Sequence, residues 1–281
     1  MKHLMYCLLF SLAITPLINA QEHLAMTINI RFDSPNDGIN KWENRKNEVV
    51  ALLRYYQPGI VGTQEGLKHQ LKVISDGIPN YKMIGVGRDD GKEKGEFSAL
   101  FYDTNQYKLL GHNTFWLSET PDKISIGWDA SMERICTYGL FEDRLTKTKF
   151  YVFNAHFDHI GKEAREQSAK LITRMAEKIN TTKIPVLVMG DFNSEPTDTP
   201  ILHFNSVMND SYSAASNAAY GPVGTFSGFN KNQALNRRID YVFTTNDIDV
   251  THYRAIDDRR PDGNFISDHL PVLIKYSFTA K

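Results

Sequence analysis

Cysteine is nearly absent from this sequence. Its 281 residues include only Cys7 and Cys136. Cys7 lies within residues 1–20, where Lys2 precedes a mostly apolar run and the small residue Ala20 ends the segment. This pattern predicts a secretory signal peptide that is cleaved. Cys136 is then alone in the mature chain, no intrachain disulfide can form, and the exported domain must be stabilised by its core.

Hydrophobic runs long enough to cross a membrane are also missing. The apolar stretch of residues 4–18 is interrupted by Pro16, and it is shorter than the roughly 20 residues that a transmembrane helix needs. We therefore interpret residues 1–20 as a cleaved signal and not as an anchor. Residues 21–281 are long enough for one large core. We expect them to form a soluble domain without a membrane span that is secreted or periplasmic.

Neither sign of charge dominates the sequence. Lysine and arginine total 32 and the acidic residues total 33, which gives a net charge of −1. Removal of Lys2 with the signal makes the chain one unit more negative, and no basic run occurs. A protein that grips long nucleic acid usually carries a positive field. The composition therefore argues against a strong basic surface for nucleic acid, although it does not exclude short strands.

Several widespread catalytic motifs do not occur. The mature chain has no pair of cysteines, no HExxH zinc motif, no GxSxG nucleophile turn and no Walker phosphate-binding loop. These absences argue against the enzyme classes that such motifs mark. Carboxylates, amides and imidazoles are the groups that remain for chemistry.

The order of apolar segments indicates one layered domain. Helical apolar stripes occupy residues 42–56 and 164–179, and no repeat or flexible linker follows residue 21. Short apolar or alternating runs typical of strands are Met26–Ile30, Gly59–Val61, Phe97–Tyr102, Cys136–Phe141, Phe150–Phe153, Val186–Met189, Ile239–Phe243 and Leu270–Tyr276. The mixture of helical and hairpin-like connections predicts a single α/β layered domain.

Six of these strands have polar groups at or near one end. The groups are Asn29, Glu65, His156 with Asp158, Asp191 with Asn193, Asp240, and Asp268 with His269. Any one of them has an ordinary explanation, because Asp and Asn favour turns and helix caps. Six together favour convergence, since strand ends of a layered sheet meet at a rim where ligands often bind.

The types of these side chains suggest a reaction. Carboxylate and amide oxygens suit a hard divalent cation such as Mg²⁺ or Mn²⁺. Such a cation, together with imidazole and amide donors, suits attack by water on a phosphate ester, because it neutralises charge on the phosphoryl oxygens while a base takes the proton of the water. We therefore expect phosphoester chemistry at this rim.

An ordered set of motifs resembles the endonuclease/exonuclease/phosphatase superfamily. The motifs are INIRFD, GTQE, GEFSALFY, NAHFDH, VMGDFNSEP, RRIDYVF and SDHLPV. The match is deoxyribonuclease-like, runs from about residue 25 to 277, and is most similar to a secreted bacterial branch. The resemblance implies a four-layer sandwich of the α+β class, in which two packed mixed β-sheets are flanked by helices in one domain over 21–281.

The resemblance also implies a metal centre. Glu65 would be the principal ligand, and Asn29 and Asp268 would lie beside the metal, directly or through water. The expected ion is Mg²⁺ or Mn²⁺, with Ca²⁺ as a further candidate. Exonuclease III-like members have an acid two places after the first Asn, where this sequence has Arg31. A second acidic ligand is therefore absent there.

Catalytic roles follow from the same resemblance. Asp191 would orient or deprotonate the attacking water, and Asn193 would donate a hydrogen bond to the phosphoryl oxygens. His269 would contact the phosphate and assist proton transfer, while Asp240 would hold its other ring nitrogen. A carboxylate in that position fixes the tautomer of an imidazole and favours its charged form.

A second acid–imidazole pair, Glu96 with His156, matches the deoxyribonuclease-like pattern. Glu96 could instead be a surface charge. Residues proposed to contact the substrate each have an equally ordinary structural alternative in the core, in a turn or in a surface ion pair. They are Arg31, Tyr102, Trp128, Arg134 and Asp158.

Three functions remain open on the sequence. The first is a metal-dependent phosphodiesterase or nuclease acting on short nucleic acid or a small diester. The second is a phosphatase of the same fold acting on a sugar, inositol or lipid phosphate. The third is a binding module that keeps the fold without catalysis, which the retention of all six polar strand ends disfavours. A monomer is expected in each case.

Overall fold

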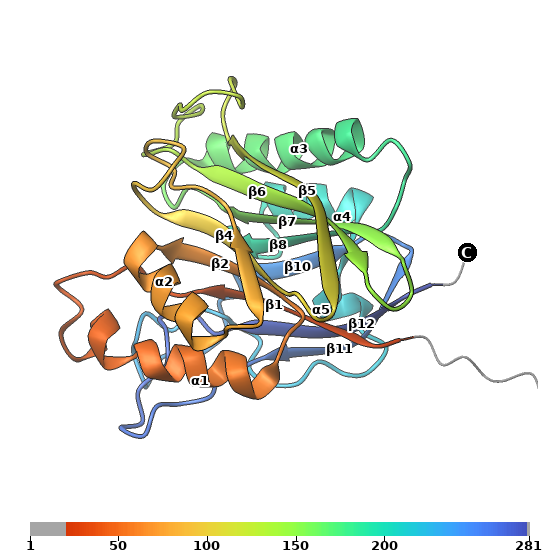
Figure 1. The fold of residues 1–281 in the computed structure, drawn as a ribbon. Coiled ribbons are helices and arrows are strands. Elements are labelled where there is room, and N and C mark those ends of the chain that lie inside the picture. Colours follow the sequence, from red (N-terminus) through yellow and green to blue (C-terminus); the bar gives the residue numbers. More distant parts are fainter. Residues whose placement is uncertain (1–20, 280–281) are drawn as a thin grey trace, which may run out of the picture.

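The computed structural model describes residues 21–279 and shows two β-sheets packed face to face with helices outside them (Figure 1). The expected four-layer sandwich in a single domain is confirmed. The predicted signal peptide, residues 1–20, lies outside the described residues and stays a prediction. Within the described part, no helix is long and apolar enough to span a bilayer.

Each sheet has six strands. The first has the order β11-β12-β1-β2-β4-β3, and the second has the order β5-β6-β7-β8-β10-β9. In chain order the strands are β1 (His23–Asn29), β2 (Ile60–Gly66), β3 (Tyr81–Ile84), β4 (Phe97–Asp103), β5 (Tyr107–Trp116), β6 (Ile135–Asp143), β7 (Lys149–His156), β8 (Val186–Asp191), β9 (Asn209–Asp210), β10 (Asp240–Thr244), β11 (Ile248–Ala255) and β12 (Val272–Phe278). Both sheets are mixed, because β1 pairs in parallel with β2 and β7 pairs in parallel with β8.

Helices cover the outer face of each sheet. The helices are α1 (Lys46–Tyr56), α2 (Lys68–Gly77), α3 (Lys162–Ile179), α4 (Thr199–Val207) and the short α5 (Ser211–Ala214), and two 3-10 turns, Gly38–Asn40 and Trp42–Asn44, precede α1. α1 and α2 pack on the first sheet, and α3 and α4 pack on the second. One apolar cluster lies between each sheet and its helices, and a third apolar cluster fills the space between the two sheets. Burial of these three apolar clusters is the main stabilising contribution to the fold.

A buried amide network joins the two sheets beneath the strand ends. Nε2 of Gln64 donates to Oδ1 of Asn154 at 2.7 Å. Nδ2 of Asn154 donates back to the backbone oxygens of Thr63 and Ala99. A Cβ on Gly62 would lie 2.8 Å from Oδ1 of Asn154. Glycine is therefore required at that position for the sheets to approach closely enough to make the network.

All eight predicted strands and both predicted helical stripes are present, but the hydrophobic pattern of the sequence does not predict several other elements. β3, β5, β9, β11, α4 and α5 are absent from the predicted set. β5 lies at a sheet edge and is exposed over most of its central residues, so its sequence does not alternate. In β11 a bulge between Val250 and His252 breaks the period of two. Hydrophobic alternation therefore identifies the strands that are buried and regularly paired.

A buried histidine lies at the end of the sandwich opposite the polar strand ends. His23, the first residue of β1, is 2% exposed, and its Nδ1 is 2.8 Å from the hydroxyl of Tyr107. Burial lowers the pKa of His23 below its usual value, and the carboxylate of Asp143, 3.8 Å away, only partly opposes this. The folded protein therefore holds His23 neutral more firmly than the unfolded chain does.

This burial predicts acid sensitivity. Because the pKa is lower in the folded state, the contribution of His23 to stability is complete above pH ~6.5 and is lost as the pH falls below that value. Between pH 7.5 and 5.0, the free energy of unfolding of His23→Gln should fall by about 1 kcal/mol less than that of the wild type. Urea titrations at both pH values measure this. The exposed His112→Gln is the control, and equal losses in wild type and His23→Gln would contradict the assignment.

Candidate active site

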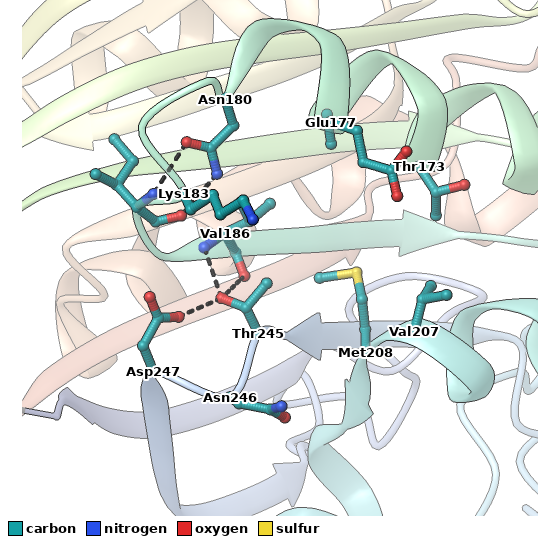
Figure 2. A pocket seen from close by; sticks show the side chains of 12 residues that line it. Thr173, Glu177, Asn180, Lys183, Val186, Val207, Met208, Thr245, Asn246 and Asp247 are labelled. Atoms are coloured by element: carbon teal, nitrogen blue, oxygen red, sulfur yellow. Dashed lines mark hydrogen bonds between the residues drawn. The ribbon is translucent and has the colours of Figure 1, made fainter.

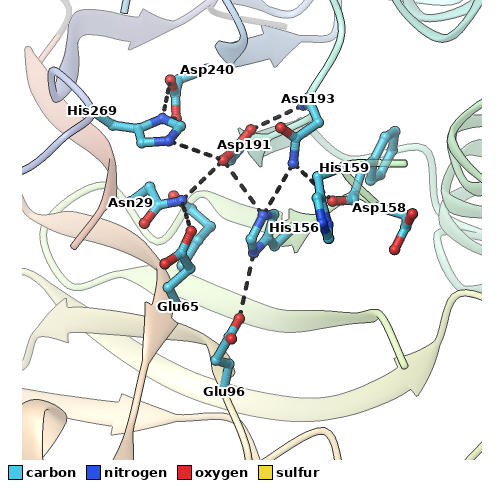
Figure 3. Close-up of polar contacts among 12 residues, drawn as sticks. Asn29, Glu65, Glu96, His156, Asp158, His159, Asp191, Asn193, Asp240 and His269 are labelled. Carbon is cyan, nitrogen blue, oxygen red and sulfur yellow. Dashed lines mark hydrogen bonds and ion pairs between the residues drawn. The ribbon is translucent and has the colours of Figure 1, made fainter. Parts of the chain in front are cut away.

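The polar strand ends converge at one end of the sandwich (Figure 3). The parallel pairs bring Asn29 beside Gln64 and His156 beside Asp191, and the first residue of β10, Asp240, pairs with Asp191. A cavity of about 580 Å³ opens there. Its lining comprises Arg31, Phe32, Glu65, Arg88, Glu96, Met132, Arg134, His156, His159, Asp191, Asn193, Phe226, Arg237, Ile239, Asp268 and His269.

A second cavity, of about 610 Å³, lies near the opposite end of β8, between the ends of α3 and α4 (Figure 2). Val186, Met208 and Asp247 are among its lining residues. Over residues 21–279, the cluster of acidic and imidazole groups close enough to share a metal ion belongs to the first cavity. We therefore assign the site to the first cavity, although the second is slightly larger.

The end of β8 is shaped by its backbone. Gly190 has a φ of +148°, and a Cβ there would lie 1.9 Å from the backbone oxygen of Ala155. Only glycine can occupy this place, where β8 approaches β7. Phe192 turns into the core and is fully buried. Asn193 has a left-handed φ of +46°, and its N–H donates to Oδ1 of Asp191 at 2.9 Å. The segment is therefore both a turn and a part of the site.

Asn29 connects two of the carboxylates. Its Nδ2 donates to Oε1 of Glu65 at 2.8 Å and to Oδ2 of Asp191 at 3.0 Å. Its Oδ1 accepts from the N–H of Arg31 at 2.9 Å. The amide oxygen therefore faces the backbone, and the amide hydrogens position the acids. This orientation supports an indirect role beside the metal. The other oxygen of Glu65 accepts from the N–H of Phe32 at 3.0 Å.

The predicted Asp240–His269 pair is present. Nδ1 of His269 lies 2.9 Å from Oδ2 of Asp240, and Nε2 lies 3.6 Å from Oδ2 of Asp191. Burial lowers the pKa of His269, but the charges of Asp240 and Asp191 outweigh it and raise the pKa well above its usual value. The imidazolium form is therefore favoured in the cavity, where it can donate to a phosphoryl oxygen.

Asp191 has the properties of a base that works near neutral pH. Burial raises its pKa to about 7, and Asp240 adds to this while His269 opposes it. Asp268 also has a raised pKa because of burial, with His269 opposing. A carboxylate with a pKa near the working pH accepts a proton efficiently, and the neighbouring imidazolium keeps acid and base roles apart.

The nearest polar partner of His156 is not the predicted one. Glu96 lies 3.9 Å from Nδ1 of His156, but its two oxygens receive a bidentate hydrogen bond from Arg88 at 2.8 and 3.0 Å. Nδ1 of His156 instead accepts from Nη1 of Arg134 at 3.1 Å. The expected pairing is therefore present only as this longer contact, while the hydrogen bonds of Glu96 go to Arg88. The reason is that guanidinium groups bind carboxylates in two-pronged geometry more strongly than imidazole does.

The same arginines affect the charge of this region. Burial and then the positive charge of Arg134 lower the pKa of His156 well below its usual value. Arginine and amide nitrogens only donate, and donors face both ring nitrogens of His156: Arg134 at Nδ1 and, at 3.2 Å, Nδ2 of Asn193 at Nε2. Nε2 lies 3.5 Å from Oδ2 of Asp191. Burial raises the pKa of Glu96 to about 7, although Arg88 opposes this.

Three residues predicted to contact substrate do not line the cavity. Tyr102 pairs with Ile60 at the far end of β4 and packs in the core between the sheets. Trp128 packs against the cluster beneath α3. Asp158 is 1% exposed and accepts from the backbone of Ile160 and Gly161 and from Arg134. Each of these side chains is used in packing or in holding a loop, so the structure does not place them at the cavity.

Arg31 and Arg134 do line the cavity, and three further basic groups were not among the predicted site residues. These are Arg88, His159 and Arg237. Arg88 belongs to the charged loop of residues 88–94, and its backbone oxygen accepts from the indole of Trp116. A lone arginine in a polar loop gives no periodic signal, so only the three-dimensional structure assigns Arg88 and Arg237 to the site.

The donor set fits a divalent cation. Ligand atoms of Glu65 and Asp191 lie within 4.8 Å of each other and of His269, and Asp268 lines the same cavity. Because the charged form of His269 has no free lone pair, the carboxylates are the groups that could hold a cation. Carboxylate oxygens predominate in this set, as Mg²⁺ and Mn²⁺ prefer. A bound cation would neutralise charge on phosphoryl oxygens and lower the pKa of a coordinated water.

The two-sheet fold, with a buried acid, an acid–imidazole pair and oxygen donors at one end, defines a phosphoester hydrolase. The chain belongs to the endonuclease/exonuclease/phosphatase family, whose family model matches residues 26–269. Members of this family hydrolyse phosphoesters and include nucleases and a phosphatase.

Solved structures and a curated relative agree with this membership. An endonuclease/exonuclease/phosphatase from Bacteroides vulgatus is 38% identical, with a TM-score of 0.87 over 92% of this chain and 99% of its own. A mannosyl-6-phosphatase from Bacteroides thetaiotaomicron is also 38% identical, with a TM-score of 0.87 over 91% of this chain and all of its own length. Exodeoxyribonuclease III from Haemophilus influenzae is 24% identical over 58% of each chain.

The Asp240–His269 pair predicts a large catalytic effect. His269→Ala removes the imidazolium that faces the phosphate, so turnover of a phosphoester should fall roughly 10²-fold or more, as for other positioned acid–base groups. Steady-state kinetics measure this, with His112→Ala on the exposed surface of β5 as the control. Turnover near that of the wild type in a folded His269→Ala protein would remove His269 from the mechanism.

Proposed function

We propose that the protein is a divalent-cation-dependent phosphatase that acts on the phosphomonoester of a sugar or a similarly small polar molecule. The balance of charge in the cavity carries this proposal. Four arginines line it, and four carboxylates face them: Arg31, Arg88, Arg134 and Arg237 against Glu65, Glu96, Asp191 and Asp268. The charged His269 is balanced by Asp240. A bound divalent cation therefore leaves two positive charges in excess, which matches the dianion of a phosphomonoester better than the single charge of a diester.

The size of the cavity supports a small substrate. Its volume of about 580 Å³ falls within the roughly 300–1,000 Å³ of sites that bind small molecules. Phe32, Met132 and Phe226 give it apolar wall segments. Similarity to the mannosyl-6-phosphatase supports a sugar phosphate as the substrate.

The proposed reaction uses residues already placed in the site. Asp191 takes the proton of the attacking water, since its pKa of about 7 suits a base. His269, charged and held by Asp240, donates to a phosphoryl oxygen or to the leaving oxygen. Asn193 lines the same cavity, and its amide would donate to a phosphoryl oxygen in place of its contact with Nε2 of His156. Arg88 and Arg134 bind the remaining phosphoryl oxygens, since guanidinium groups match that geometry.

A phosphodiesterase or nuclease is the second candidate and is the function that the sequence alone favours. The similarity to exodeoxyribonuclease III supports it. A binding module without catalysis has no support in the structure, because Glu65, Asp191, Asp240 and His269 are assembled together. The two catalytic candidates differ in the charge and size of the ester that they take.

A substrate panel separates the two candidates. With Mg²⁺ or Mn²⁺ present, we expect kcat/KM for mannose 6-phosphate or another sugar phosphate to exceed that for bis-p-nitrophenyl phosphate and for short single-stranded DNA or RNA by about 10²-fold, because the second negative charge is worth a few kcal/mol in such a cavity. Inositol phosphates and sphingomyelin complete the panel. A preference for any diester would contradict the phosphatase and support the nuclease.

Dependence on a cation is a separate prediction. Excess EDTA should abolish hydrolysis of the best substrate, and Mg²⁺ or Mn²⁺ added beyond the chelator should restore it, because the carboxylates of the cavity need a cation to face a phosphate. Circular dichroism checks that the chelated protein stays folded. Full activity in chelator would refute the cation assignment whichever ester is preferred.

A further inference from the structure

The backbone of Arg31 is held in an uncommon conformation by buried side chains. Its φ is +56°, in the left-handed region. Its backbone oxygen accepts from Nη2 of Arg45 at 2.6 Å and from Nε2 of Gln70 at 2.9 Å, and both of these side chains are fully buried. Such strain persists only where the surrounding structure imposes it. The direction in which the Arg31 side chain leaves the backbone is therefore determined by the fold.

The guanidinium of Arg31 contacts three carboxylates from three segments. Two hydrogen bonds, at 3.1 and 3.2 Å, join it to Asp37. Nη1 lies 3.7 Å from Oε2 of Glu65, and Nε lies 3.8 Å from Oδ2 of Asp268. The side chain also lies over the ring of Phe32. Asp37 thus fixes the guanidinium beside Glu65 and Asp268, both of which face the proposed cation site.

We propose that the fixed positive charge of the Arg31 guanidinium limits the site to a single divalent ion and sets the affinity for that ion. The inference rests on the proposed cation-dependent function and adds to it. A fixed positive charge near Glu65 and Asp268 lowers the attraction of this side of the cavity for a metal ion. Because the guanidinium contacts Asp37, Glu65 and Asp268, no two of these carboxylates are free of it to bind a second ion.

Substitution of Asp37 distinguishes an effect of the charge of Arg31 from a purely structural effect of the Arg31–Asp37 pair. If Arg31 acts through its charge, Arg31→Gln removes a repulsive charge and tightens cation binding. Asp37→Asn removes the negative charge that partly neutralises the guanidinium, so it weakens cation binding. If the pair only held the loop in place, both substitutions would break the same two hydrogen bonds and would move the affinity in the same direction.

The experiment is calorimetric titration of the apo protein with Mn²⁺, supported by electron paramagnetic resonance of free Mn²⁺ to count sites. Wild type should bind one ion. Arg31→Gln should bind Mn²⁺ about fivefold more tightly or better, and Asp37→Asn about twofold more weakly or worse, from the Coulomb energies at these separations. Arg31→Lys, which keeps the charge, should stay within about twofold of the wild type.

Arg237→Gln is the matched control. Arg237 lines the same cavity but pairs with Glu195, so its removal should leave the Mn²⁺ affinity within about twofold of the wild type. Thermal unfolding without cation confirms that each variant folds. Two ions bound by wild type, equal tightening by Arg237→Gln, or shifts of one sign in Arg31→Gln and Asp37→Asn would overturn the inference. Absence of saturable Mn²⁺ binding in wild type would instead overturn the cation-dependent function on which it rests.

Discussion

The carboxamide of Asn29 is the interaction on which the site depends. Asn29 ends β1 in the first sheet, and its two amide hydrogens reach Glu65 in the same sheet and Asp191 in the second. One side chain therefore sets the distance between the acid expected to hold a cation and the acid expected to take a proton. The amide oxygen is occupied by the backbone of Arg31, so the carboxamide has one orientation. Beneath it, Gln64 and Asn154 join the sheets again.

Placing so many acids together is costly, and the surroundings offset that cost. Buried carboxylates are destabilising unless they are paired or hydrogen-bonded. Asp240 is compensated by His269, Glu96 by Arg88, and Asp268 in part by Arg31. The raised pKa values of Glu96 and Asp191 show that the compensation is incomplete. A bound cation would supply the missing positive charge for these carboxylates, and a phosphate would supply the missing hydrogen-bond partners.

Much of this arrangement could be predicted from the sequence, and the failures have physical reasons. The buried strands and the polar ends at Asp191 and Asp240 are apparent because alternation and turn chemistry are local. The partner of Glu96 is not, because the choice between Arg88 and His156 depends on how three distant segments pack. Tyr102 could be placed only by its register with β2, which puts it at the end of the sheet away from the site.

In the proposed reaction, water attacks phosphorus at this end of the sandwich. The most direct measurement is hydrolysis of the best substrate in H₂¹⁸O, followed by mass spectrometry of both products. Attack at phosphorus, with Asp191 as the base, predicts ¹⁸O in the released phosphoryl product and none in the alcohol. Label in the alcohol would mean that the carbon–oxygen bond is broken, and it would contradict the account.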